Sequence, residues 1–104
     1  MSKQLLYRIT TNSLWEASGD TLELSEMDSE FIHFVEEVDI DRIIKKYFRG
    51  ESSIVVLTID PNMLIGRLVK ELNPGGSKEY YHLYNGSVPR SAVIDVERRN
   101  FGTV

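Results

Sequence analysis

Segments with the pattern of a β-strand outnumber helical segments in this sequence, and this imbalance limits the folds open to it. Six or seven stretches are rich in β-branched and aromatic residues, whereas only two have helical spacing. Each parallel crossover between strands usually needs a helix of its own. The sequence therefore predicts an α+β domain with a mixed, mainly antiparallel β-sheet and two or so helices packed on it. A doubly wound parallel sheet is not expected.

The clearest helical pattern covers about residues 37–49. Its apolar residues share the i, i+3, i+4, i+7, i+8 spacing of one helix face; they are Ile40, Ile43, Ile44, Tyr47 and Phe48. Acidic residues crowd its first turn and basic residues its last, as the helix dipole favours, and Gly50 is expected to end it. A shorter helix is predicted over residues 13–18, in which Glu16 follows Ser13 at the spacing of a capping box.

The strand-like segments are bounded by polar or Gly- and Pro-containing stretches. They cover residues 4–10, 21–25, 31–35, 53–59, 67–72, 79–85 and 92–99. The segment 53–59 is a continuous β-branched run, which is typical of a strand buried on both faces. Residues 26–30 read as a polar turn, and residues 73–78, with two adjacent glycines, as a flexible loop.

The length of the chain, 104 residues, is that of one domain, so residues 1–104 are expected to fold as a single domain. It contains no cysteine, which excludes thiol nucleophiles, CxxC redox chemistry and thiolate zinc sites, and fits a reducing compartment. The N-terminal apolar stretch is too short for a signal peptide, and no run approaches the roughly 20 apolar residues of a membrane span. A cytoplasmic location without membrane attachment is therefore expected.

Charge is distributed unevenly along the chain. Residues 16–41 contain ten carboxylates and no Lys or Arg, whereas the rest carries all 12 basic and six acidic residues, a net charge of +6. This pattern indicates a polarised surface that can steer an anionic ligand toward its basic side. The alternative is that the acids merely solvate loops and a helix start. No basic run with interleaved aromatic residues suggests nucleic-acid binding.

Two histidines, His33 and His82, lie inside aromatic strand segments. A histidine with its ordinary pKa of about 6.5 can act as acid, base or hydrogen-bond donor at physiological pH. The alternative is that each is a structural histidine tied to a backbone group. Two histidines without a third ligand make a weak metal site, so no metal is predicted.

Four further residues are candidates for ligand contacts or chemistry. Arg8 lies in the middle of the first strand and can hold phosphate or carboxylate in a bidentate fork; the alternative is an arginine at a strand edge that points to solvent. Glu71 is embedded in apolar sequence and can serve as a general base or stabilise a cation, although a surface ion pair is the alternative. Tyr7 and Tyr84 can stack on a ring or belong to the core and its rim.

Several short segments occur in a recognisable order: LYRIT, a tryptophan soon after it, FIHF, KYF before a glycine, VVLTID, KEL, and HLYN, SVP and SAV near the end. Together they resemble the bacterial domain-of-unknown-function family numbered nine hundred and fifty-two. That family is similar to the ADP-ribosyltransferase-like fold, which binds NAD in a cleft between two small sheets. The resemblance implies a split, mixed β-sheet with few helices.

The resemblance also implies roles for some residues. In transferases of this fold, a His or Arg on the first strand contacts the nicotinamide-side ribose. Arg8 matches this position, where the family usually has histidine and some branches of the superfamily use arginine. Glu71 is a possible counterpart of the late glutamate that stabilises an oxocarbenium charge. In those transferases a second motif stacks on or positions the nicotinamide. Two positions depart from the family there: Glu30 replaces a glycine before FIH and Val35 replaces a serine after it, and the loss of the serine puts this second motif in doubt.

These observations lead to one leading hypothesis and one alternative. The leading hypothesis is a domain that binds a nucleotide-like ligand of the NAD or ADP-ribose type. Arg8, His33, His82, Tyr7 and Tyr84 bind this ligand, and glycosyl transfer, if it occurs, uses Glu71 and His33. The alternative is a non-catalytic protein-interaction or regulatory domain that keeps the fold. The leading hypothesis requires that Arg8, His33 and His82 meet at one cleft.

Overall fold

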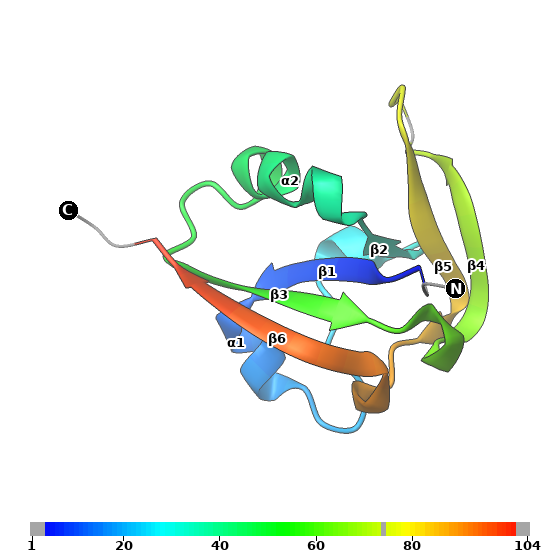
Figure 1. The fold of residues 1–104 in the computed structure, drawn as a ribbon, viewed down its shortest axis with the longest axis horizontal. Coiled ribbons are helices and arrows are strands. Elements are labelled where there is room, and N and C mark those ends of the chain that lie inside the picture. Colours follow the sequence, from blue (N-terminus) through cyan, green and yellow to red (C-terminus); the bar gives the residue numbers. More distant parts are fainter. Residues whose placement is uncertain (1–3, 74, 102–104) are drawn as a thin grey trace.

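The chain forms two three-stranded antiparallel sheets and two α-helices (Figure 1). The computed structural model describes residues 4–73 and 75–101. The first sheet has the order β1-β3-β6, with β1 (Leu6–Thr11), β3 (Ser53–Ile59) and β6 (Val93–Asn100). The second has the order β2-β5-β4, with β2 (Ile32–Phe34), β5 (Glu79–Ser87) and β4 (Ile65–Leu72). The prediction of an α+β domain with mainly antiparallel pairing is confirmed.

The central strand β3 is buried on both faces, as its continuous apolar run predicted. Val55 and Leu57 belong to the larger core, which also contains Trp15 of helix α1 (Asn12–Ala17). Ile54 and Val56 face the other way, into a smaller core with residues of helix α2 (Ile40–Tyr47). The two helices accordingly cover opposite faces of the first sheet (Figure 1).

The two sheets meet at a single bridge, so the predicted split in the β-structure is observed. Tyr7 of β1 and Val35, just after β2, exchange both backbone hydrogen bonds at 2.8 Å. Beyond this pair the chain turns away into a 3₁₀ turn, Glu37–Asp39, and then into α2. Strands β1 and β2 therefore part immediately after they touch, and the gap opens beside Tyr7.

Both predicted helices form, but with different ends. α2 begins at Ile40 rather than near residue 37, because the preceding residues form the 3₁₀ turn, and Gly50 follows it with a φ of +90°. The capping box predicted for the short helix is wrong. Its N-cap is Thr11, whose hydroxyl accepts from the Leu14 amide, while Glu16 pairs with an arginine of β6.

The strand predicted at residues 21–25 does not form. Thr21 makes only an isolated bridge to Pro89, and the segment after it has no regular structure. Pro89 is followed at once by the 3₁₀ turn Arg90–Ala92, so the opposite segment is not extended beyond the bridge. The hydroxyl of Ser18 accepts from the Glu23 amide instead. The alternating pattern reflects burial of Leu22 in the core, not strand pairing.

The remaining strands agree with the predicted segments to within two residues at each end, and the predicted loop 73–78 joins β4 to β5; its residue 74 lies outside the described part of the chain. No helix among the described residues is long and apolar enough to span a bilayer.

The acidic segment 16–41 does not remain an isolated negative surface. Several of its carboxylates pair with basic residues from elsewhere in the chain; these pairs are Glu16–Arg98, Asp28–Arg8, Glu36–Lys70, Asp39–Arg42, Asp39–Lys78 and Asp41–Arg99. Folding thus brings the acidic and basic parts of the sequence together. The alternative that these acids only solvate loops is therefore incomplete.

Candidate functional site

A cleft of about 240 Å³ lies where the two sheets part. Its walls come from β1, β2, α2, the 3₁₀ turn Glu26–Asp28 and the start of the loop after β4. Many of the lining side chains are aromatic or aliphatic. The lining residues are Tyr7, Arg8, Ile9, Ser25, Met27, Asp28, His33, Phe34, Val35, Ile43, Tyr47, Phe48, Asn73 and Tyr80. Mostly apolar walls with a few polar groups are typical of small-molecule sites.

Arg8 is buried and does not point to solvent, so the strand-edge alternative is wrong. Only 4% of it is exposed, and its side chain forms a bidentate ion pair with Asp28. One terminal nitrogen lies 3.2 Å from Asp28 Oδ1 and the other 2.6 Å from Oδ2. The first also donates to the backbone carbonyl of His33 at 3.1 Å. Its Nε is buried without a hydrogen-bond partner among the described residues.

Asp28 is the centre of this polar group. Its Oδ2 accepts from both the amide and the hydroxyl of Ser25 at 3.0 Å, and its Oδ1 accepts from the His33 amide at 3.2 Å. Burial acts to raise the pKa of Asp28, but hydrogen bonds from His33 and Arg8 and the charge of Arg8 outweigh it. The pKa therefore lies well below its ordinary range. Asp28 is an ionised carboxylate held in one position.

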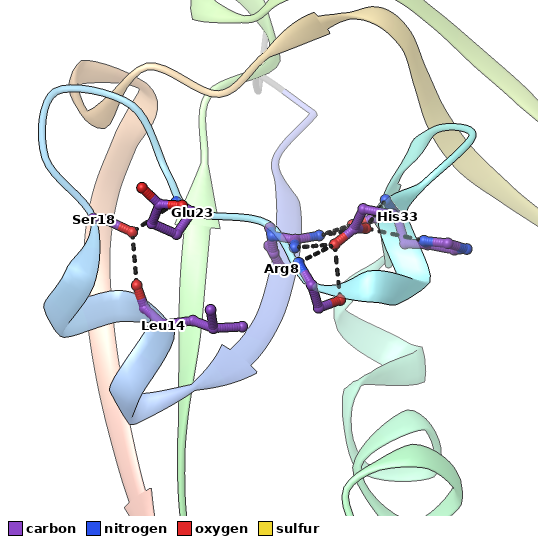
Figure 2. Close-up of polar contacts among 7 residues, drawn as sticks. Arg8, Leu14, Ser18, Glu23 and His33 are labelled. Atoms are coloured by element: carbon purple, nitrogen blue, oxygen red, sulfur yellow. Dashed lines mark hydrogen bonds and ion pairs between the residues drawn. The ribbon is translucent and has the colours of Figure 1, made fainter.

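His33 adds an imidazole to the same group. Figure 2 shows His33 and Arg8 on either side of a shared set of polar contacts, with the His33 ring on the side away from Arg8, and its Nδ1 lies 3.1 Å from Asp28 Oδ1. About a third of the side chain, 32%, is exposed, and the ring lines the cleft. His33 is therefore both anchored and accessible.

His82 lies directly opposite His33 in the β2–β5 ladder. The two ring centroids are 5.6 Å apart, in an edge-on arrangement. His82 is completely buried, and Phe31 stacks on it at a centroid distance of 3.9 Å. Its ring is bound on both sides, with Nδ1 2.8 Å from Glu71 Oε2 and Nε2 2.7 Å from Asn73 Oδ1. Among residues 4–73 and 75–101, neither histidine ring is hydrogen-bonded to a backbone group, unlike the alternative of a structural histidine tied to the backbone.

Glu71 is not a surface ion-pair partner of a lysine or arginine; it joins His82 to Tyr84. The Tyr84 hydroxyl donates to the same Oε2 that meets His82. Hydrogen bonds from Tyr84 and His82 lower the pKa of Glu71, and the bond to Glu71 raises the pKa of Tyr84. The guanidinium of Arg67 lies 5.0 Å from the centre of the Tyr84 ring. Glu71 is therefore ionised and Tyr84 protonated at neutral pH.

The predicted site residues fall into two adjoining groups. Tyr7, Arg8 and His33 line the cleft. His82, Glu71 and Tyr84 do not line it, so the requirement that Arg8, His33 and His82 meet at one cleft is met for Arg8 and His33 but not for the buried His82. These three form a second group beside the cleft, connected through the His33–His82 contact and through Asn73, which lines the cleft and binds His82.

Sequence reasoning missed three residues of this site. The sequence pattern predicts only a polar turn around Asp28, a flexible loop around Asn73 and a strand that contains Phe31. A local signal existed for Asp28, because Ser25 and Asp28 have the Ser-x-x-Asp spacing of a helix start, and the Asp28 carboxylate accepts from the Ser25 amide as in a capping box. Within residues 4–73 and 75–101, no group of three His, Cys, Asp or Glu side chains is placed to hold a metal ion.

The fold and the cleft define a small α+β domain with a split antiparallel sheet. The model of a protein family of unknown function, DUF952, matches residues 9–96, and the chain belongs to that family. Protein CC0527 from Caulobacter crescentus has a similar structure, with 28% sequence identity and a TM-score of 0.78 over 90% of this chain and 84% of that chain. A double mutant of CC0527 gives the same identity and coverage with a TM-score of 0.77. Among curated proteins, no significant match is found.

Proposed function

We propose that the chain is a small-molecule binding domain whose cleft takes one end of a nucleotide-like ligand of the NAD or ADP-ribose type. The observation that carries this proposal is the fixed polar group of Arg8, Asp28 and His33 at the edge of a cleft with aromatic walls. Tyr7, Phe48 and Tyr80 offer faces or edges for a flat ring. The polar group offers contacts for ribose hydroxyls.

The size of the cleft favours part of such a ligand. Sites for drug-sized molecules span roughly 300–1,000 Å³, and this cleft encloses about 240 Å³. A ring with its sugar suits that volume better than a complete dinucleotide, whose remainder would extend into solvent. The similarity of the family to the ADP-ribosyltransferase-like fold supports the same class of ligand, as an analogy of fold.

By the same analogy, the chemistry of the site is cleavage of an N-glycosidic bond. Glu71 is ionised and lies beside the cleft, outside its lining, so in this proposal its carboxylate stabilises the positive charge that develops on a ribose held at the edge of the cleft. His33, which is exposed to the cleft, is the group placed to move a proton. In this proposal His82 and Tyr84 hold Glu71 in place.

Replacing His33 with alanine is expected to weaken ligand binding about 10-fold, because one hydrogen bond to the ligand is lost. Isothermal titration calorimetry with NAD, ADP-ribose and nicotinamide measures the effect. Arg98→Ala is the control, since Arg98 is half-exposed on β6, in the other sheet, and pairs with Glu16. Folded wild-type protein that binds none of the three ligands would contradict the proposed function.

Glu71→Gln is expected to slow NAD cleavage by roughly 100-fold or more, in the range seen when one stabilising group is removed from a transition state. The amide keeps the size of the side chain and an oxygen for the Tyr84 hydroxyl, but it lacks the negative charge. Release of nicotinamide, separated by chromatography, is the measurement. Equal rates for the variant and the wild type would remove Glu71 from the chemistry while leaving the binding proposal intact.

The alternative function, a non-catalytic protein-interaction domain, is favoured by one feature. Strand β4 forms an edge of the second sheet, and Ile65 and Leu72 at its two ends are both more than half exposed. Exposed apolar groups along an open edge suit pairing with another chain. A folded protein that binds none of NAD, ADP-ribose and nicotinamide would favour this alternative.

A further inference from the structure

One ring nitrogen of His33, Nδ1, is hydrogen-bonded within the protein. Its Nδ1 lies 3.1 Å from Asp28 Oδ1. An ionised carboxylate offers only lone pairs, so the nitrogen that faces it must carry the proton. The opposite tautomer would place two lone pairs against each other.

Asp28 cannot turn away from His33 without losing other bonds. Both of its oxygens are held, by the two terminal nitrogens of Arg8, by Ser25 and by the backbone amide of His33. The amide of His33 binds the same oxygen as its ring. The carboxylate, the guanidinium and the strand therefore fix the plane and the tautomer of the ring together.

The other ring nitrogen of His33 is available. Nε2 makes no hydrogen bond to any part of the chain that the structure describes, the ring lines the cleft, and a third of the side chain is exposed. In the tautomer set by Asp28, a neutral His33 carries an unprotonated Nε2. Nε2 of His33 is thus a hydrogen-bond acceptor for a ligand in the cleft.

The cleft offers no unpaired cation to compete for a phosphate. Among its described lining residues, Arg8 and Asp28 are the two that carry a permanent charge, and they neutralise each other. An ionised phosphate has only acceptor oxygens, so it cannot donate the hydrogen bond that Nε2 of a neutral His33 would accept. A sugar hydroxyl can, because it donates.

We infer that Asp28 is a positioning residue that presents Nε2 of His33 as an acceptor, and that the cleft therefore selects a sugar hydroxyl of its ligand over a phosphate. The selectivity rests on the proposed function; the role of Asp28 does not. In this arrangement the nucleoside end of the ligand enters the cleft, and any phosphate stays outside.

Ring-nitrogen NMR of the wild-type protein tests the role of Asp28 without any substitution. At an alkaline pH at which the ring is neutral, the expected result is a protonated Nδ1 and an unprotonated Nε2 in His33. His82, whose two ring nitrogens are both hydrogen-bonded, is the internal comparison. A His33 with the proton on Nε2 would overturn the inference.

Titration with nicotinamide riboside and nicotinamide mononucleotide tests the selectivity. The riboside is expected to bind at least as tightly as the phosphorylated compound and to shift the Nε2 signal of His33 while Nδ1 stays bound to Asp28. Mononucleotide binding more than 10-fold tighter, or riboside binding without an Nε2 shift, would overturn the selectivity but not the proposed function. If neither compound nor NAD binds, the proposed function and the selectivity both fail, and the tautomer alone decides the role of Asp28.

Discussion

Asp28→Asn is expected to lower the free energy of unfolding by about 3–5 kcal/mol, the cost typical of removing one partner of a buried ion pair. The reason is the burial of its partner, because Arg8 would keep its charge with only 4% of the residue exposed. The amide still offers one oxygen, but it brings an N–H₂ group to face a donor. Denaturant unfolding followed by circular dichroism measures the change.

Asp41→Asn is the matched control. Asp41 also pairs with an arginine, Arg99, but its side chain is 82% exposed, and exposed pairs contribute about 0–1 kcal/mol. The same chemical change should therefore have little effect there. If Asp28→Asn proves as mild as Asp41→Asn, the buried pair is not a main support of the fold.

The same ion pair predicts how stability depends on pH. The pKa of Asp28 is lower in the folded protein than in the unfolded chain, where it is about 3.9. The stabilisation is therefore fully present above about pH 5 and is lost as the pH falls through the unfolded pKa toward the lower folded pKa, since the unfolded chain binds the proton first. The difference in unfolding free energy between wild type and Asp28→Asn should narrow between pH 5 and pH 3. A constant difference would contradict this origin.

Gly86→Ala is expected to destabilise the domain by roughly 2–4 kcal/mol, at the upper end of single substitutions. A Cβ at this position would lie 1.7 Å from the carbonyl oxygen of Ile65 and 2.8 Å from the Cα of Gly66. These are backbone atoms, so no side chain can rotate to make room. The position lies at the irregularity in the β4–β5 ladder between Ile65 and Arg67, where two glycines bring the strands unusually close.

Gly19→Ala is the control for this second prediction. A Cβ on Gly19 would meet nothing within 4 Å, and the residue has no positive φ. It should change stability by less than about 1 kcal/mol. Thermal unfolding of the two variants side by side is the measurement. Similar melting temperatures would mean that the β4–β5 ladder shifts easily at its bulge.

Local sequence patterns predicted much of the fold. The β-branched run of β3 has the predicted bounds, Ser53–Ile59, and the apolar stripe of α2 packs against it. The small number of helices implied antiparallel pairing, and each strand pair described is antiparallel. The exception, residues 21–25, failed because pairing also depends on the opposite segment, which there enters the 3₁₀ turn Arg90–Ala92 directly after Pro89.

The candidate site also has residues that the sequence indicated and residues that it did not. Residue types in a strand marked Arg8, His33 and His82 as unusual, since a polar group in an apolar segment needs a partner. Their partners were not predictable, because Asp28 lies 20 residues from Arg8 and Asn73 lies nine residues before His82. Such pairs depend on where separate strands end and meet in space. A linear sequence thus records the propensities and polarity of each segment, whereas the cleft exists because β1 and β2 touch at one pair of residues and then part.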